Sequence, residues 1–290
     1  MILITGATGA LGLELTKNLF DRSLPVRVSV RDRSRAKSLS FPGIELVVGD
    51  FVRPSTFDSA LAGVDQLFLL NPCSPQLEQP LCNFVDAAKR ARVKHIVNLS
   101  QFGTDAGASG RYLRYHAAVE YHIMKSRIPC TFLRPNLFMQ SLLCFRSIIS
   151  SQGALFASVG TAKVSAIDVR DVAAVAVATL TQSIHEGKTY ELTGPEPLSY
   201  AEMASQLSQA LGKTIKHIDV PPHNTLQTLL DLGVPAWRAD ALMDGYDHYR
   251  RGEAAAVTTT VYDVIQREPT GFSQFAADYA HQFLRKAAGA

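Results

Sequence analysis

The chain has 290 residues and a formal net charge of +3, and 47% of its residues are hydrophobic while 19% are charged. These values are ordinary for a globular protein with one large or two modest domains, and the small charge argues against nucleic-acid or membrane partners. No apolar run reaches the ~20 residues of a membrane-spanning helix. A chain that starts directly on a strand leaves no room for a signal peptide, so we expect a cytoplasmic protein.

Residues 2–12 predict a buried strand, a glycine turn and the first turn of a helix. Gly6, Gly9 and Gly12 stand in G-x-x-G-x-x-G spacing, and leucines follow at helical spacing. One glycine lets the chain turn tightly, one lets backbone N–H groups approach a pyrophosphate, and one lets the helix pack closely on the sheet. The positive end of that helix would face the phosphates, whereas a plain tight turn is the alternative. We therefore predict a dinucleotide site that includes Gly6, Thr8, Gly9, Ala10, Leu11 and Gly12.

The second predicted strand, residues 25–30, is followed at once by Arg31. An acid at this position binds the ribose 2′-hydroxyl of NAD, whereas an arginine suits the 2′-phosphate of NADP. Asp32 comes one residue late and should point elsewhere. We therefore predict NADP(H) as the preferred cofactor and NAD(H) as the alternative, with Arg31 as the first phosphate ligand and Arg35 as the second. A solvated charge run that opens a helix would look the same.

Further strands are predicted at residues 44–48, 65–70 and 95–100, and helical patterns separate them. This alternation predicts an α/β fold with a parallel sheet and helices on both faces. The carboxyl ends of such strands form the ligand crevice, so Leu70 and Asn71 should lie along the cofactor. Ser100 ends the third of these strands, and Phe102 should point at substrate. The helix that carries Leu77, Leu81, Phe84, Val85 and Ala88 should bury these residues as core.

Residues 111–126 predict a helix with two candidate tyrosine constellations. One is Tyr121-x-x-x-Lys125, which ends just before Pro129. The other is Tyr112-x-x-x-His116-x-x-x-Glu120, whose members share one helical face because they are four residues apart.

Two segments carry a family resemblance. Thr-Gly-Ala-Thr-Gly-Ala-Leu-Gly at residues 5–12 resembles the cofactor motif of extended and atypical short-chain dehydrogenases/reductases. His-x-x-x-Glu at 116–120 and Arg-Pro at 134–135 are similar to the NmrA-like atypical branch, which includes triphenylmethane-dye and quinone reductases. The resemblance implies a doubly wound parallel-sheet Rossmann fold, with an NAD(P)-binding domain at 1–195, which takes core strands from the second half, and a mostly helical substrate lobe at 196–290.

The resemblance also implies roles for individual residues. It places Tyr112 in the catalytic tyrosine slot, His116 in the slot of the usual lysine, and Ser100 in the position of the catalytic serine. Histidine is not permanently charged at pH 7, which argues against a Tyr–Lys mechanism, and a structural histidine is the alternative. The other roles are the cofactor contacts Asp50, Phe51, Pro135 and Asn136, and the substrate contact Phe138.

The second half predicts mainly structural features. Asp168 should cap a helix, and Ser199 and Glu202 form a capping box for a helix that stops at Gly212. Trp237 lines the substrate pocket or simply packs. Phe272, Phe275, Tyr279 and Phe283 repeat at helical spacing and predict a docking helix. The four cysteines, Cys73, Cys82, Cys130 and Cys144, lack paired metal spacing, so we expect free, largely buried thiols and no metal.

Three functions remain open from the sequence. The first is an NADPH-dependent reductase that transfers hydride to a flat conjugated small molecule, such as a quinone, an iminium ion or a dye. The second is a non-catalytic dinucleotide-binding redox sensor, which the missing lysine would fit. The third is a nucleotide-sugar epimerase or dehydratase, against which the histidine argues because those enzymes use the Tyr–Lys pair. A monomer and a homodimer are both compatible with the sequence.

Overall fold

The computed structural model describes residues 1–39, 41–71 and 74–284, except the side chains of Arg35, Lys37, Ser38 and Pro75. Its contacts form two compact units. The first unit comprises Met1–Pro135, Val169–Glu191 and Asp263–Ile265, and the second comprises Asn136–Asp168, Leu192–Tyr262 and the residues from Gln266 on. Residues 136–168 thus group with the second unit, whereas the predicted division at residue 195 assigns them to the first domain. That division stays a prediction.

A seven-stranded sheet in the order β3-β2-β1-β4-β5-β6-β9 forms the centre of the first unit. The pairings among β1 to β6 are all parallel. The strand order reverses between β1 and β4, which is where ligands bind in doubly wound sheets. The predicted Rossmann-type α/β fold is therefore confirmed. The strands are β1 (Ile2–Ile4), β2 (Val26–Val30), β3 (Glu45–Val48), β4 (Gln66–Leu70), β5 (His95–Leu99), β6 (Cys130–Pro135) and β9 (Thr189–Leu192).

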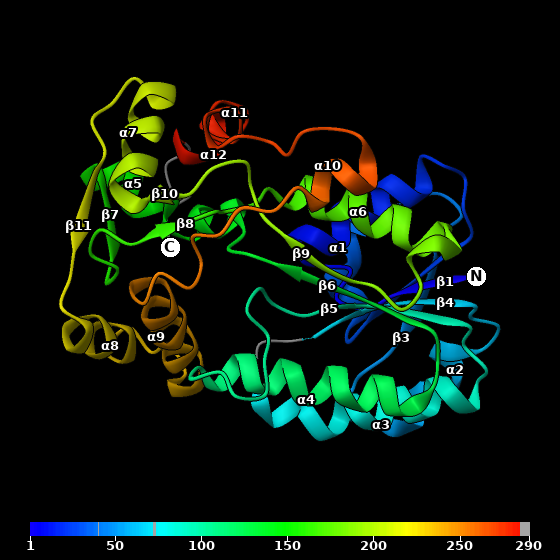
Figure 1. Ribbon diagram of the computed structural model, residues 1–290. Coiled ribbons are helices and arrows are strands. Elements are labelled where there is room, and N and C mark those ends of the chain that lie inside the picture. The colour runs from blue at the N-terminus through cyan, green and yellow to red at the C-terminus, as the bar shows by residue number, and fades with distance from the viewer. Residues whose placement is uncertain (40, 72–73, 285–290) are drawn as a thin grey trace. The chain divides into compact units, whose positions relative to one another are not determined.

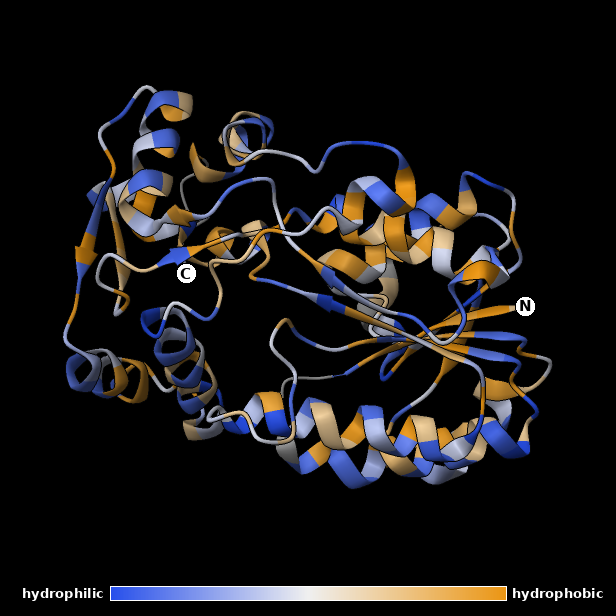
Figure 2. Ribbon diagram, in the orientation of Figure 1, coloured by the Kyte–Doolittle hydropathy of each residue, from blue (hydrophilic) through white to orange (hydrophobic). Residues whose placement is uncertain are grey.

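Helices cover both faces of this sheet. In Figure 1, α1 and α6 lie above the sheet, and α3 and α4 lie below it. The apolar sides of these helices turn towards the strands in Figure 2. Strands β1, β2 and β5 are buried along their whole length. Of these three, only β1 is continuously apolar, since β2 contains Arg27 and Ser29 and β5 contains His95 and Asn98. The helices of this unit are α1 (Ala10–Phe20), α2 (Phe57–Leu61), α3 (Glu78–Arg90), α4 (Arg111–Ser126) and α6 (Val169–Thr181), with short 3-10 helices η1 (Arg33–Leu39), η2 (Pro54–Thr56), η3 (Pro75–Leu77) and η5 (Ser183–His185).

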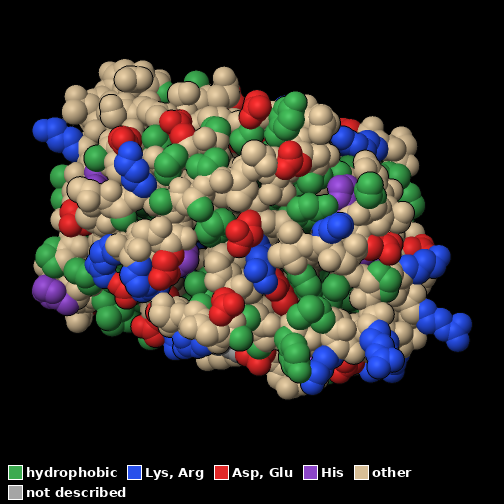
Figure 3. All heavy atoms as spheres, viewed as in Figure 1, with side chains coloured by type: hydrophobic (Ala, Val, Ile, Leu, Met, Phe, Trp, Pro, Cys, Tyr) green, Lys and Arg blue, Asp and Glu red, His purple; other side chains and the backbone are tan. Residues whose placement is uncertain are grey.

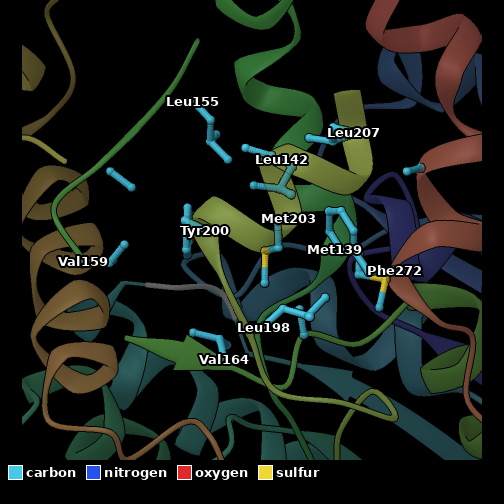
Figure 4. Packing of buried hydrophobic residues seen from close by; sticks show 14 of the residues in the cluster. Met139, Leu142, Leu155, Val159, Val164, Leu198, Tyr200, Met203, Leu207 and Phe272 are labelled. Atoms are coloured by element: carbon cyan, nitrogen blue, oxygen red, sulfur yellow. The ribbon is translucent and has the colours of Figure 1, made fainter. Parts of the chain in front are cut away.

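The second unit has a core of its own, part of which Figure 4 shows around Met139, Tyr200, Met203 and Phe272. Two small strand pairs belong to it: β7 with β11, which are parallel, and β8 with β10, which are antiparallel. Helix α10 (Thr260–Ile265) has residues in both units. The elements are η4 (Met139–Phe145), α5 (Arg146–Gln152), β7 (Ala154–Ala157), β8 (Lys163–Val164), β10 (Leu198–Ser199), α7 (Tyr200–Leu211), β11 (Lys216–Asp219), α8 (Pro222–Asp231), α9 (Ala236–Arg250), α11 (Phe272–Asp278) and α12 (Ala280–Leu284).

The predicted capping box is confirmed, whereas the predicted docking helix is wrong. Ser199 Oγ accepts from the Glu202 N–H at 3.2 Å, and Gly212 ends α7 with a φ of +61°. Two short helices, α11 and α12, replace the single helix because the backbone leaves helical geometry at Tyr279. The three phenylalanines of this segment are nevertheless buried, as their spacing predicts.

The cysteines agree only in part with expectation. Cys82 is buried, Cys130 is half-buried, and Cys144 is exposed on η4, so the expectation of burial is wrong there; Cys73 lies outside the described residues. Among the described residues no cluster of three or more His, Cys, Asp or Glu side chains could hold a metal, and none of their helices is long and apolar enough to cross a membrane. Basic and acidic side chains are interspersed over the face drawn in Figure 3.

Candidate functional site

Two of the three glycines of the first turn are required by the fold itself. Gly6 has a φ of +66°, in the left-handed region that favours glycine. A Cβ on Gly12 would lie 2.3 Å from the Gly6 carbonyl oxygen, so no side chain fits between helix and loop. A Cβ on Gly9 would meet only that oxygen, at an ordinary 3.5 Å. The predicted turn and packing roles are confirmed, and the bare backbone at Gly9 leaves space that a ligand can use.

Helix α1 begins at Ala10 and directs its N-terminus at this loop. Gly9 is the N-cap, it provides no side-chain cap, and the first turn carries no acidic residue. Its first N–H groups and the helix dipole therefore favour an anion. Leu11 is buried in the core, so it can meet a ligand only through its backbone.

A cavity of about 420 Å³ opens beside this loop. Its walls come from the glycine turn and from the carboxyl ends of β2, β3 and β4. Leu77, which the helical pattern assigns to the core, is half-buried on η3 and lines this cavity instead. The lining residues are Thr5, Gly6, Thr8, Gly9, Ser29, Val30, Arg31, Gly49, Asp50, Phe51, Val52, Leu70 and Leu77.

A second cavity of about 380 Å³ shares four lining residues with the first and carries two arginines. The Arg31 side chain is exposed, and no described residue hydrogen-bonds to it. Asp32 also lines this cavity, contrary to the expectation that it points elsewhere, and its Oδ1 accepts from the Ser34 N–H at 2.9 Å. The side chain of Arg35 lies outside what the structure describes.

Sequence reasoning missed Arg53 at this cavity. Its Nε donates to Asp50 Oδ2 at 2.9 Å, and one terminal nitrogen donates to the Arg31 carbonyl at 3.3 Å. The pair offsets the charge of Asp50 beside the loop. The signal was available, because Arg53 follows β3 by a few residues and the carboxyl ends of parallel strands meet at one edge.

A chain of buried amides leads from β5 to α4. Asn98 Nδ2 donates to Asn71 Oδ1 at 2.7 Å, and Asn71 Nδ2 lies 3.3 Å from His116 Nδ1. All three side chains are buried, and burial lowers the pKa of His116 to about 4. His116 is therefore a neutral imidazole at pH 7, and no described residue partners its Nε2.

A second buried cluster lies along the same helix face. Ser100 Oγ donates to Glu120 Oε1 at 2.5 Å, and Arg134 binds both oxygens of that carboxylate at 3.0 and 2.5 Å. Glu120 is only 4% exposed at its side chain, so this is a nearly dry ion pair. The hydroxyl proton of Ser100 is already committed to Glu120.

The structure places the two tyrosine constellations on different faces of α4. Tyr112, His116 and Glu120 are all buried on one face of α4. Tyr121 and Lys125 are exposed, with the ammonium 4.6 Å from the ring centroid. The literal Tyr-x-x-x-Lys therefore lies on the outer face of α4.

The remaining candidates divide between the units. Phe102 and Pro135 are buried in the first unit, where the Phe102 N–H donates to the Pro135 carbonyl at 2.9 Å. In the second unit, Asn136 uses its amide internally, donating to Ser165 Oγ at 2.9 Å and to the Ala254 carbonyl at 2.8 Å. Phe138 is half-buried just before η4, and Trp237 on α9 is 37% exposed. The structure assigns no ligand contact to these residues.

Comparison with known proteins identifies relatives along almost the whole chain. The NmrA-like family matches residues 1–273. An NAD(P)H azoreductase from Xenophilus azovorans is 35% identical over 283 residues, which cover 98% of this chain and 99% of the relative. The crystal structure of Citrobacter sp. triphenylmethane reductase complexed with NADP(H) is 29% identical with a TM-score of 0.85, covering 97% of this chain and 100% of that chain.

An NADPH-dependent quinone oxidoreductase from Escherichia coli, complexed with NADPH, is also similar. It is 26% identical with a TM-score of 0.86, covering 96% of this chain and 99% of that chain. Together with the glycine loop, the family match over most of the sequence establishes that the chain belongs to the NmrA-like family.

Proposed function

We propose that this protein is an NADPH-dependent reductase that transfers hydride to a flat, conjugated small molecule. The observation that carries the proposal is the glycine-lined cavity at the N-terminus of α1, with the Arg31 side chain at its rim. The azoreductase, triphenylmethane reductase and quinone oxidoreductase relatives support the same class of reaction.

The residues present fit the cofactor. The bare backbone at Gly9 and the α1 N-terminus would hold the diphosphate, and Arg31 would bind the 2′-phosphate. Asp50 and Phe51 would flank the adenine, while Leu70, Asn71, Pro135 and Asn136 would lie along the rest. When bound, NADPH supplies a hydride and leaves as NADP⁺; a neutral acceptor such as a quinone takes up that hydride and a solvent proton, whereas a cationic acceptor takes up the hydride alone.

The acceptor is the small-molecule partner, and its class follows from what the buried face of α4 offers. That face carries no lysine to hold a tyrosine ready as an acid, so an acceptor that needs little proton assistance suits it. His116 and Tyr112 are the proposed catalytic contacts, and Phe102, Phe138 and Trp237 the proposed substrate contacts. Ser100 remains a candidate, but it could only accept a hydrogen bond because its own proton goes to Glu120.

The test is to incubate the purified protein with NADPH or NADH and a panel of quinones, azo dyes and cationic dyes. We expect turnover with NADPH to exceed that with NADH. Arg31→Ser should lower kcat/KM for NADPH by about 10-fold and leave that for NADH nearly unchanged, because only NADPH carries the 2′-phosphate. Lys89→Ser, at an exposed position on α3, is the matched control for loss of one positive charge.

No cofactor oxidation on any acceptor would contradict the reductase. If calorimetry then still showed tight binding that discriminates reduced from oxidised dinucleotide, a redox sensor would replace it. Light scattering of the same sample would decide between monomer and homodimer, and fractionation of the source cell would test the proposed cytoplasmic location.

A further inference from the structure

Hydrogen bonds connect the Leu69 carbonyl to His116 through the side chains of Asn98 and Asn71. The known polarity of that carbonyl therefore determines which imidazole nitrogen carries the proton. The Leu69 carbonyl is an acceptor and nothing else. Asn98 Nδ2 lies 3.2 Å from it, so this amide edge of Asn98 must be its NH₂ group. The register of the sheet enforces the contact, because Leu69 and Asn98 are partners in the β4–β5 ladder.

The orientation of Asn98 then determines that of Asn71. The same NH₂ group of Asn98 lies 2.7 Å from Asn71, so the Asn71 atom that faces it must be the carbonyl oxygen. Turning Asn98 round would place its oxygen against two acceptors. The price is that Asn98 Oδ1 has no partner among the described residues although it is buried. An unpaired buried acceptor costs free energy, so the two hydrogen bonds that the NH₂ group donates must be what favours this orientation of Asn98.

The orientation of Asn71 finally determines the tautomer of His116. Asn71 presents its NH₂ group to His116 Nδ1 at 3.3 Å, so Nδ1 must accept. A neutral imidazole whose Nδ1 accepts carries its single proton on Nε2.

We propose that Asn98 and Asn71 are positioning residues that hold His116 as the neutral Nε2–H tautomer, a hydrogen-bond donor for a neutral substrate with a lone pair at its reducible group. Quinone carbonyls and azo nitrogens belong to this class. The catalytic consequence rests on the proposed reductase activity, whereas the tautomer does not.

The surroundings of His116 keep it neutral. Burial is the cause that lowers its pKa, and no charged neighbour contributes to that shift. Glu120, one helical turn along α4, is paired with Arg134 and Ser100. From the sheet come only neutral amides among the described residues: Asn98 lies on β5, and Asn71 directly follows β4. Tyr115 packs beside the imidazole with ring centroids 5.1 Å apart.

A neutral N–H donor differs in effect from an imidazolium. It stabilises charge that develops on an oxygen or nitrogen as that atom takes the electron pair, without carrying charge beforehand. It therefore needs no protonation near pH 7, and the step it assists should not depend on pH through this group.

The direct test is nuclear magnetic resonance of ¹⁵N-histidine-labelled protein. The chain has 8 histidines, and the signals missing from His116→Gln identify those of His116. We expect a bare Nδ1 and a protonated Nε2, unchanged between about pH 6 and pH 8. A protonated Nδ1, or an imidazolium in this range, would overturn the proposal. This measurement needs no turnover, so it stands apart from failure of the proposed function.

A single substitution should reverse the direction of the hydrogen bond between residue 71 and His116. In Asn71→Asp the carboxylate can still accept from Asn98, but it must also accept from His116, so the proton moves to Nδ1 and the pKa of His116 rises. We expect kcat/KM for a neutral naphthoquinone to fall about 10²-fold at pH 8, the usual effect of removing one donor. Activity should then recover as the pH falls, because protonation returns a proton to Nε2.

The matched control is Asn83→Asp, which adds the same charge at an exposed position on α3, where Gln79 Nε2 donates to the side-chain oxygen. We expect the wild-type pH profile and spectrum there. Identical pH profiles for Asn71→Asp and the wild type would overturn the positioning role. If Asn71→Asp failed to fold, the wild-type spectrum would still decide the tautomer.

Discussion

Two buried polar clusters lie under the same face of α4, and they are built on opposite principles. Around Glu120, a charge is matched by Arg134 and by the Ser100 hydroxyl, so its hydrogen-bonding capacity is used inside the protein. Around His116, a chain of neutral amides runs from β5 to the helix and leaves Nε2 without a described partner.

From this difference we propose that the Glu120 cluster stabilises the fold and that the His116 cluster faces the substrate. A closed ion pair ties α4 to the ends of β5 and β6, and opening it would leave a buried charge. The hydrogen-bonded series Asn98–Asn71–His116 instead ends at His116 Nε2, which holds no second element of the described chain in place. Four predictions test this division, beginning with the largest expected effect.

Glu120→Gln should lower the free energy of unfolding by about 3–5 kcal/mol, because it leaves the Arg134 guanidinium partly buried without its carboxylate. Urea denaturation measures the change. Asp247→Asn is the control, since it removes the carboxylate of a pair in which the Asp247 side chain is 49% exposed and that of Arg250 is 33% exposed, and it should cost at most about 1 kcal/mol. Equal losses in the two variants would show that the Glu120 cluster is not special.

His116 should make the wild type acid-sensitive. Its folded-state pKa of about 4 lies below the ordinary 6.5, so the unfolded chain binds the proton more readily and stability is lost as the pH falls from 6.5 towards 4. The wild type should lose about 3 kcal/mol more than His116→Gln over this range. Denaturation curves at several pH values measure the difference, and parallel losses would contradict a buried neutral imidazole.

Ser100→Ala should cost about 2 kcal/mol of stability, because it removes a hydrogen bond to an ionised carboxylate. If Ser100 belongs only to the closed cluster, kcat/KM should change by less than about threefold once the variant is folded. A fall of about 10²-fold with normal stability would instead make Ser100 catalytic.

Tyr121→Phe and Lys125→Ala should change the free energy of unfolding by no more than about 0.5 kcal/mol and leave kcat/KM unaltered, since both side chains are exposed. Thermal melts and NADPH-oxidation assays of the two variants check this. A large loss of activity in either would return the literal Tyr-x-x-x-Lys pair to the mechanism and undo the distinction between the two clusters.

The sequence was sufficient for the elements whose signals are local. The glycine turn, the strands β1 to β5, the helix α4 and the capping box at Ser199 depend on spacing, periodicity and side chains within a few residues of each other. The shared face of Tyr112, His116 and Glu120 follows from helical geometry alone. The prediction of one continuous docking helix was wrong because the helix breaks at Tyr279, where the sequence has no glycine or proline to indicate a break.

Only the tertiary structure decided the contacts between strands that are distant in sequence. The Arg53 contact with the Arg31 carbonyl, the meeting of Ser100 and Arg134 on one carboxylate, and the Asn98–Asn71 hydrogen bond all depend on how strand ends align across the sheet. A one-dimensional pattern specifies which face of a strand is buried, but the partner of each polar group is set by register and by the packing of a helix over it. The sequence was therefore enough to place Tyr112, His116 and Glu120 on one helical face. The tautomer of the His116 imidazole could be inferred only from the side-chain amides that lie beside it in the tertiary structure.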